Sequence, residues 1–210
     1  MTVADNNPMN GGTGVPACDG LVSKNAVLDA VASLMCRRFD VAAEPNKPLV
    51  LECGDLSPLC RPMKAPTGHR TPNHVTIIAD LYLPTPLHCI VQFDDATHCT
   101  RERSKTFANY PSDIPLNFDV RRYLADQTPG DAALAQSDML ADLLPPKHGL
   151  NPTVRIRFDE IDELNGPLVE RIELLLSKRF AYHAGTTFHL MVDNAGAKPH
   201  SQTMYKGLSD

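Results

Sequence analysis

Two apolar runs decide the fold: HVTIIADLYL (His74–Leu83) and HCIVQFD (His88–Asp94), with Pro84-Thr85-Pro86 between them. Both runs are rich in the β-branched and aromatic residues that favour strands. Strands that are apolar over most of their length suit a sheet that is covered on both faces. The prolines between the runs indicate a turn. The two runs therefore predict neighbouring strands of a buried central sheet.

The rest of the chain predicts helices around these strands. Ser23 is a suitable N-cap for a helix that ends near Phe39, and the apolar run at 49–53 indicates a short buried strand. Later patterns predict helices over 100–108, 119–127, 131–144 and 167–180, and strands over 152–158 and 187–192. This order is typical of an α/β fold with a mixed central sheet of four to five strands flanked by helices.

The composition is that of one soluble domain. The chain has 210 residues, 42% of them hydrophobic, no Trp and a formal net charge of −5. We expect the domain at 21–193, a disordered N-terminal tail at 1–20 and a flexible C-terminal tail at 194–210. No run approaches the roughly 20 apolar residues of a membrane span, and no signal peptide is recognised. These features predict a cytoplasmic protein without a membrane partner.

Polar side chains gather in and directly after the two strands. Asp80 lies within the first strand, where an unpaired carboxylate would be costly. Gln92 and Asp94 share one face of the second strand, because side chains alternate along a strand. Carboxylates on neighbouring strands suit Mg²⁺ or Mn²⁺, which makes Asp80 and Asp94 candidate metal ligands. A nearby His98 is suited to accept a proton from a metal-bound water.

Basic side chains flank these candidate ligands. Arg101, Arg103 and Lys105 fall at the start of a predicted helix, where cations and N-terminal amides together favour phosphate. The long connection at 54–73 is also basic and is predicted to contact nucleic acid through Arg61, Lys64 and Arg70. The negative net charge speaks against a general affinity for nucleic acid, but a local cluster remains compatible with it. Together the residues predict metal-assisted hydrolysis of a phosphodiester.

The same residues resemble a known family. Ala79-Asp80, the run IVQFDDATH (Ile90–His98) and Arg103 are similar to the nuclease core of the PD-(D/E)XK superfamily. The resemblance is closest to the branch that includes very-short-patch-repair-like endonucleases. Tyr110-Pro111 and HGLNPTVR (His148–Arg155) also resemble segments of uncharacterised bacterial relatives in that branch.

The resemblance covers roughly residues 49–158 and implies a restriction-endonuclease-like fold. It further implies a Mg²⁺-dependent DNA endonuclease. Asp80 would be the principal metal ligand, the strand end at 92–94 would supply the second-strand group, and His98 would be the general base. Arg101 and Arg103 would contact phosphate. The oligomeric state is left open, a homodimer included.

Two departures from the family pattern support an alternative function. Gln92 stands where the motif usually has Glu, so a metal ligand has lost its charge, and position 94 carries no Lys. The chain is therefore either a nuclease with fewer acidic ligands or a catalytically degenerate module. Such a module would bind nucleic acid or a protein partner without cleavage.

The cysteines raise a third hypothesis, a small interaction protein stapled by Cys and His around a metal. Six cysteines are present at positions 18, 36, 53, 60, 89 and 99. Cys53 and Cys60 lie too far apart in sequence for the tight pairs of structural zinc sites, even with His69 and His74 following. Zinc is therefore disfavoured, and buried reduced thiols are expected.

Overall fold

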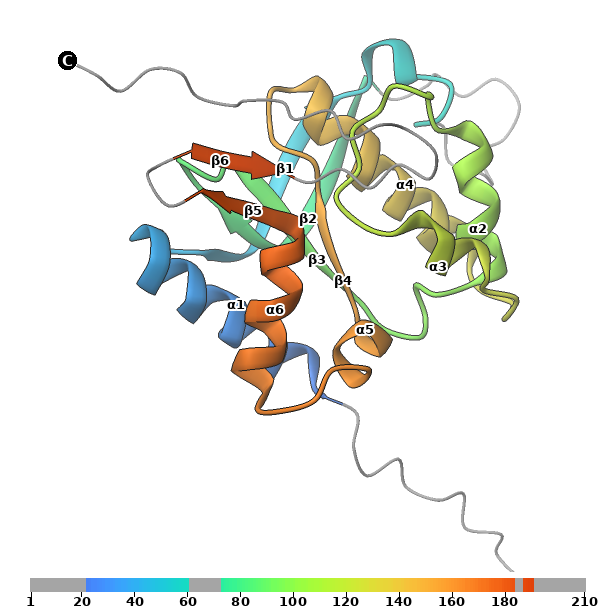
Figure 1. Ribbon diagram of the computed structural model, residues 1–210. Helices are drawn as coiled ribbons and strands as arrows, with labels where there is room; N and C mark the ends of the chain where they lie inside the picture. Colours follow the sequence, from blue (N-terminus) through green and yellow to red (C-terminus); the bar gives the residue numbers. More distant parts are fainter. Residues whose placement is uncertain (1–21, 61–72, 184–186, 191–210) are drawn as a thin grey trace, which may run out of the picture.

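The computed structural model describes residues 22–60, 73–183 and 187–190, so both predicted tails and the connection at 61–72 lie outside the described residues. A four-stranded mixed sheet forms the centre, in the order β1-β2-β3-β4 (Figure 1). Its strands are β1 (Glu44–Glu52), β2 (His74–Leu83), β3 (Cys89–Asp94) and β4 (Val154–Arg157). β1, β2 and β3 are antiparallel neighbours, whereas β4 runs parallel to β3. The predicted mixed sheet flanked by helices is confirmed.

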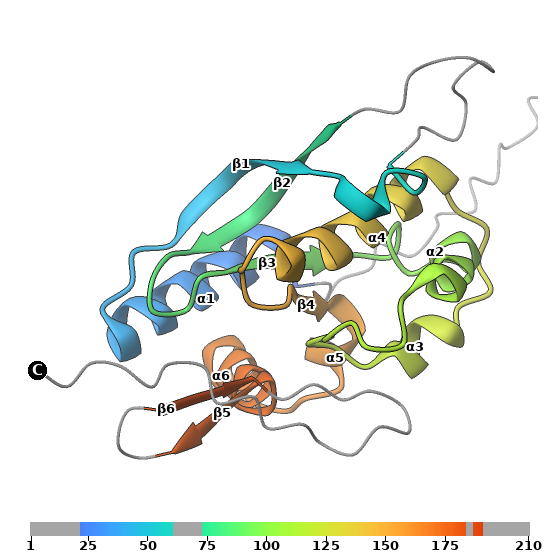
Figure 2. The ribbon, with the colours of Figure 1, turned by 90° about the horizontal axis from the view of Figure 1, so that it is seen from above.

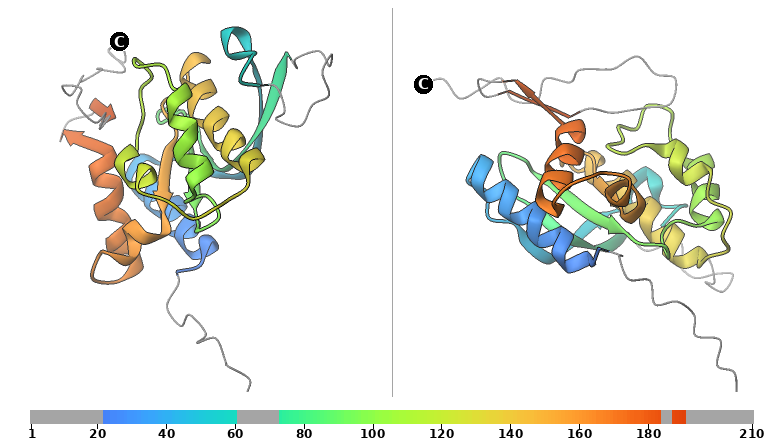
Figure 3. Two further views of the ribbon diagram at one scale, coloured as in Figure 1. Left: turned by 90° about the vertical axis from the view of Figure 1, so that its right-hand side faces the viewer. Right: turned by 60° about the horizontal axis from the view of Figure 1, so that its bottom comes forward.

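Helices cover both faces of the sheet. The α-helices are α1 (Lys24–Phe39), α2 (Arg101–Thr106), α3 (Val120–Leu124), α4 (Ala132–Lys147), α5 (Phe158–Asp162) and α6 (Leu168–Arg179). α1 and α6 lie side by side on one face (Figure 3) and bury a cluster that includes Leu81, Val91 and Ile156. α4 packs on the other face, with α2 against α4 and α3 against α2 (Figure 2). It buries a second cluster that includes Ile77 and Ile90.

The first helix forms as the sequence predicts. The Ser23 hydroxyl accepts a hydrogen bond from the Ala26 amide, which satisfies one of the free donors at the helix start. Val27, Val31 and Leu34 recur at helical spacing and are buried. The helix ends at Phe39, and the next residue, Asp40, adopts a left-handed backbone conformation.

β1 is longer than the predicted strand at 49–53, since it begins at Glu44 and contains Pro45 and Pro48. Proline lacks an amide hydrogen and breaks the ladder of a central strand. β1 is the edge strand of the sheet and pairs only with β2 among the described strands. An edge strand tolerates proline, which is why the strand begins before both prolines rather than after them.

The remaining differences concern short elements along the chain. α3 covers only Val120–Leu124 of the helix predicted at 119–127, and a 3-10 turn, η2 (Phe107–Asn109), follows α2. The last predicted strand has a partner, because β5 (Phe180–His183) pairs with β6 (Thr187–Leu190) as a separate hairpin. The connection after β1 begins with a short 3-10 turn, η1 (Gly54–Leu56).

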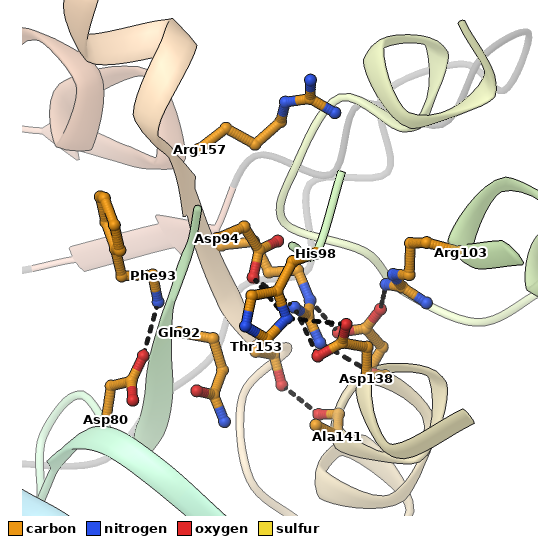
Figure 4. A network of polar contacts seen from close by, with 12 residues as sticks. Asp80, Gln92, Phe93, Asp94, His98, Arg103, Asp138, Ala141, Thr153 and Arg157 are labelled. Atoms are coloured by element: carbon orange, nitrogen blue, oxygen red, sulfur yellow. Dashed lines mark hydrogen bonds and ion pairs between the residues drawn. The ribbon is translucent and has the colours of Figure 1, made fainter. Parts of the chain in front are cut away.

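α4 continues past Leu144 through two prolines, and this extension positions the site. Pro145 has no amide hydrogen to give to the Ala141 carbonyl one turn earlier. The Thr153 hydroxyl donates to that carbonyl instead (Figure 4). Because Thr153 directly precedes β4, the bond fixes α4 against the start of that strand. The acidic residues of α4 thereby face the side chains of β4.

Candidate functional site

β2 and β3 separate at the residues that the sequence predicts as site residues. Their ladder comprises the pairs Leu81–Val91, Tyr82–Ile90 and Leu83–Cys89. Past the Leu81–Val91 pair, the two strands are connected by side-chain hydrogen bonds instead of backbone pairs. The Asp80 carboxylate accepts the Phe93 amide at 2.8 Å, and the Gln92 side-chain amide donates to the Ile78 carbonyl at 2.9 Å. Asp80 and Gln92 thus each hold the opposite strand where the backbone ladder stops.

The second partner of Asp80 is a lysine of the first helix. Lys24 Nζ lies 2.6 Å from Asp80 Oδ1, and the Asp80 side chain is only 12% exposed. Both carboxylate oxygens therefore have donors. The cluster of potential metal ligands that forms nearby contains Asp94 and His98 but not Asp80. The structure therefore does not bring Asp80 into this group with Asp94. Asp80 instead pairs with Lys24 and accepts the Phe93 amide, the second contact being drawn in Figure 4.

Removing the Asp80 carboxylate should destabilise the fold. In Asp80→Ala the amide of buried Phe93 loses its acceptor, which costs about 1–3 kcal/mol of unfolding free energy. Urea denaturation of both proteins measures this loss. Lys24→Met is the matched control and should cost no more than about 1 kcal/mol, because Lys24 is half-exposed. An Asp80→Ala protein as stable as the wild type would contradict the structural role.

Asp94 ends β3 in the interior of the protein. It is fully buried, and its carboxylate contacts Arg155 Nη1 at 2.7 Å and accepts the Tyr123 hydroxyl. Burial raises the pKa of Asp94, and the positive charge of Arg155 acts in the opposite direction. A buried carboxylate with a guanidinium and a hydroxyl as partners belongs to an internal charge network.

Two acidic residues of α4 complete that network. Asp138 and Asp142 are four residues apart, so they lie on the same face of the helix. Arg155 Nε contacts Asp142 at 2.6 Å, and Arg155 Nη1 contacts Asp138 at 3.3 Å. Burial opposes ionisation of Asp138, but the charge of Arg155 and the hydrogen bond with His98 outweigh it and lower its pKa to about 2.

His98 closes the group at its accessible side. Its Nδ1 lies 2.9 Å from Asp138 Oδ2 and 4.0 Å from Asp94 Oδ1, and 22% of its side chain is exposed. Burial alone would lower the pKa of His98. The hydrogen bond with Asp138 and the charges of both carboxylates outweigh burial, so the pKa is raised above 6.5. His98 is therefore the link between the buried carboxylates and the solvent.

The pKa of His98 predicts how stability depends on pH. A raised folded-state pKa means that His98 contributes stability fully below its ordinary pKa of 6.5 and loses it as pH rises through the folded value. We expect the stability advantage of the metal-free wild type over His98→Gln to shrink as pH rises above 6.5. Urea denaturation in the presence of EDTA at several pH values measures it. If the stability advantage of the wild type over His98→Gln grew with pH, the raised pKa of His98 would be contradicted.

One oxygen of Asp94, one of Asp138 and one nitrogen of His98 lie within 4.8 Å of one another, so these residues could hold a metal ion (Figure 4). The donor set is two carboxylates and one imidazole. Such a set suits Mn²⁺ and other first-row ions, whereas Mg²⁺ prefers oxygen throughout. The group fits a divalent cation in its donor chemistry, although Arg155 already contacts both carboxylates.

The predicted phosphate contacts divide into two kinds. Arg103 is fully buried, and its guanidinium pairs with Asp142 and donates to Tyr110 Oη at 2.7 Å. It cannot meet a phosphate in solvent without leaving these partners, so it belongs to the internal network. Arg101 and Lys105 are exposed on α2, where both pair with Glu102. Arg61, Lys64 and Arg70 lie outside the described residues.

Cys53, Cys60 and His74 belong to no group of three potential metal ligands within the described part of the chain. The one cluster of three potential ligands found there contains no cysteine. Cys53 and Cys60 are buried in an apolar cluster, and His74 lies 3.5 Å from Glu52. His69 lies outside the described residues.

Sequence reasoning missed Asp138, Asp142 and Arg155. The signal was present, since Asp138 and Asp142 interrupt a run of apolar residues in a predicted helix and Arg155 interrupts a predicted strand. Charged residues at core positions need partners in the interior. That reasoning identifies the residues as members of a network but does not say which of them meet.

Comparisons with protein-family models, with curated proteins and with solved structures give no match. The resemblance to PD-(D/E)XK nucleases therefore stays a prediction from the motifs quoted above. No helix among the described residues has both the length and the apolar character that crossing a membrane requires.

Proposed function

We propose that the protein is a metal-dependent phosphodiesterase with a restriction-endonuclease-like fold that acts on DNA. The observation that carries the proposal is the group of Asp94, His98 and Asp138, in which three potential ligands lie within 4.8 Å at the end of β3. The ligands come from β3, the turn after it and α4. They differ from the ligand pair that the family pattern implies, because Asp138 stands in for Asp80.

The carboxylates of Asp94 and Asp138 would hold Mn²⁺ or Mg²⁺, with His98 as the third donor. A bound divalent ion lowers the pKa of a coordinated water and offsets charge on a phosphoryl oxygen. His98 is the ligand with solvent access, so the substrate would approach from its side. The exposed Arg101 and Lys105 would contact flanking phosphates.

The charge of the network supports an anionic substrate. Three carboxylates face the guanidinium groups of Arg103 and Arg155, which leaves one negative charge when His98 is neutral. A divalent cation would change this to one positive charge. A phosphodiester carries the single negative charge that restores neutrality, and uncompensated charge is costly in a buried site.

A second candidate function is favoured by the partners that these residues already have. Asp80 is paired with Lys24, Gln92 is a neutral amide that donates to the Ile78 carbonyl, and Arg155 contacts both Asp94 and Asp138. These pairings suit a module that keeps the fold but does not cleave. Such a module would bind nucleic acid in a strongly salt-dependent manner, because phosphate contacts release counterions.

One experiment separates the two candidates. Purified full-length protein is incubated with single- and double-stranded DNA and RNA in Mn²⁺, Mg²⁺ or EDTA, and Mn²⁺ binding is measured separately by calorimetry. The phosphodiesterase proposal expects metal binding and Mn²⁺-dependent cleavage of DNA that EDTA abolishes. Salt-dependent binding without cleavage would favour the second candidate. The phosphodiesterase proposal would be refuted if the protein neither bound metal nor cleaved any of the substrates under any of these conditions.

A further inference from the structure

The two oxygens of the Asp94 carboxylate have different partners. Oδ2 accepts a hydrogen bond from the Tyr123 hydroxyl. Oδ1 contacts Arg155 Nη1 at 2.7 Å and lies 4.0 Å from His98 Nδ1 (Figure 4). Oδ1 is therefore the oxygen on the side of the candidate metal group, and Tyr123 holds the other oxygen of the same carboxylate.

Tyr123 has a fixed position in the core. It belongs to α3, whose first turn is capped by the Asp119 side chain, and only 1% of Tyr123 is exposed. Its ring meets the Phe118 ring edge-on, with 5.3 Å between the centroids, and the Phe107 ring lies at 5.8 Å. The guanidinium of Arg157 lies 4.6 Å from the centroid of the Tyr123 ring. A ring packed in this way also fixes the position of its hydroxyl.

The Tyr123 hydroxyl is a constant donor to one carboxylate. Burial and the negative charge of Asp94 raise the pKa of Tyr123 well above its ordinary value of 10, so the hydroxyl keeps its proton at neutral pH. A hydroxyl has a single proton to donate. Arg155, in contrast, contacts Asp94, Asp138 and Asp142. Removal of the Tyr123 hydroxyl therefore affects Asp94 alone among the three carboxylates, without a change in charge.

A second tyrosine makes the same kind of bond to a carboxylate outside the candidate metal group. Tyr110 Oη donates to Asp142 Oδ2 at 2.6 Å, and Asp142 does not belong to the group of three potential ligands. Arg103 Nη1 donates to the same hydroxyl oxygen at 2.7 Å, so the loss of this hydroxyl removes two contacts. Tyr110 is therefore a demanding control for Tyr123.

We propose that Tyr123 is a positioning residue of the metal centre, and that its hydroxyl orients Asp94 so that Oδ1 faces the ion. The inference rests on the proposed function, because it takes Asp94, His98 and Asp138 as the ligands. Ligating carboxylates keep their orientation through such hydrogen bonds, and the loss of one typically lowers metal affinity by about 10–100-fold. Tyr123 acts through Asp94 and is assigned no contact with the metal or the substrate.

Calorimetric titration of the full-length protein with Mn²⁺ tests this role. Tyr123→Phe should bind Mn²⁺ about 10–100-fold more weakly than the wild type, because the ion must then order the carboxylate itself. Tyr110→Phe, the matched control, should bind Mn²⁺ with nearly the wild-type affinity. Circular dichroism and urea denaturation in the presence of EDTA verify that both variants are folded.

Cleavage of DNA gives a second readout. Tyr123→Phe should need more Mn²⁺ for half-maximal cleavage but should approach the wild-type rate at saturating Mn²⁺, because all three ligands are kept. Replacement of Tyr123 by 4-aminophenylalanine keeps a donor at the place of the hydroxyl and should restore the wild-type affinity. This replacement carries the test if Tyr123→Phe does not fold, since weakened Mn²⁺ binding despite the retained donor would overturn the inference.

The outcomes separate this inference from the proposed function. A wild-type protein that neither binds Mn²⁺ nor cleaves DNA would refute both. Binding by the wild type with unchanged affinity in Tyr123→Phe would overturn the positioning role alone. Equal weakening in Tyr123→Phe and Tyr110→Phe would overturn it as well, because the loss would then come from the loosened network and not from the orientation of Asp94.

Discussion

Replacing Arg155 by Met is expected to lower the free energy of unfolding by about 3–5 kcal/mol. Arg155 is fully buried and contacts Asp94, Asp138 and Asp142, so its loss leaves three carboxylates in the interior with their main cation removed. Met fills much of the same volume, which leaves the charge as the principal change. Urea denaturation at neutral pH, with equilibrium followed by fluorescence or circular dichroism, measures the difference.

Arg101→Met is the matched control for the same substitution at a surface ion pair. Arg101 is exposed and pairs with Glu102, and such pairs contribute about 0–1 kcal/mol. A loss at Arg155 no larger than that at Arg101 would mean that the network does not carry the stability assigned to it. At low pH the difference in unfolding free energy between Arg155→Met and the wild type should become smaller, because protonated carboxyl groups carry no charge for the guanidinium to compensate.

Asp138→Asn is expected to reduce Mn²⁺-dependent cleavage by about 100-fold or more, under the phosphodiesterase proposal. The substitution keeps the size of the side chain and removes one of the two charges that would hold the ion. Initial rates on a DNA substrate at saturating metal, together with Mn²⁺ affinity from calorimetry, measure the effect. Both should fall, because the residue is assigned to the metal and not only to the fold.

Asp80→Asn is the informative comparison for this variant. An asparagine carbonyl still accepts the Phe93 amide, so the strand contact is kept while the charge is removed. Cleavage should persist in Asp80→Asn if Asp94, His98 and Asp138 form the centre. Loss of cleavage in Asp80→Asn with full activity in Asp138→Asn would instead support the ligand pair that the sequence motif implies.

The fold was more accessible to sequence reasoning than the site. Continuous apolar runs and helical spacing reflect burial along a single element, which is why the strands β2 (His74–Leu83) and β3 (Cys89–Asp94) and the helix ending at Phe39 can be predicted from the sequence. Boundaries were less accurate where tertiary position overrides local preference. The prolines of β1 are tolerated because β1 is an edge strand, and edge position is not visible in a local window.

The site depends on contacts between residues that are distant in the chain. Arg155 meets Asp94 across 61 residues, and His98 meets Asp138 across 40. The position of a charged residue in the sequence indicates that a partner is needed but does not name the partner. Asp80 illustrates the same point, because its place in the strand predicts a ligand, whereas the lysine that pairs with it begins a helix far upstream.

β2 contributes side chains to both hydrophobic clusters, and this has a consequence for how the molecule unfolds. Leu81 and Leu83 of β2 lie in the cluster beneath α1 and α6, whereas Ile77 and Ala79 of the same strand lie in the cluster beneath α4. One strand is therefore a structural member of both cores. Neither core can melt alone without withdrawing half of β2 from the other, so two separate hydrophobic clusters are joined into one cooperative unit.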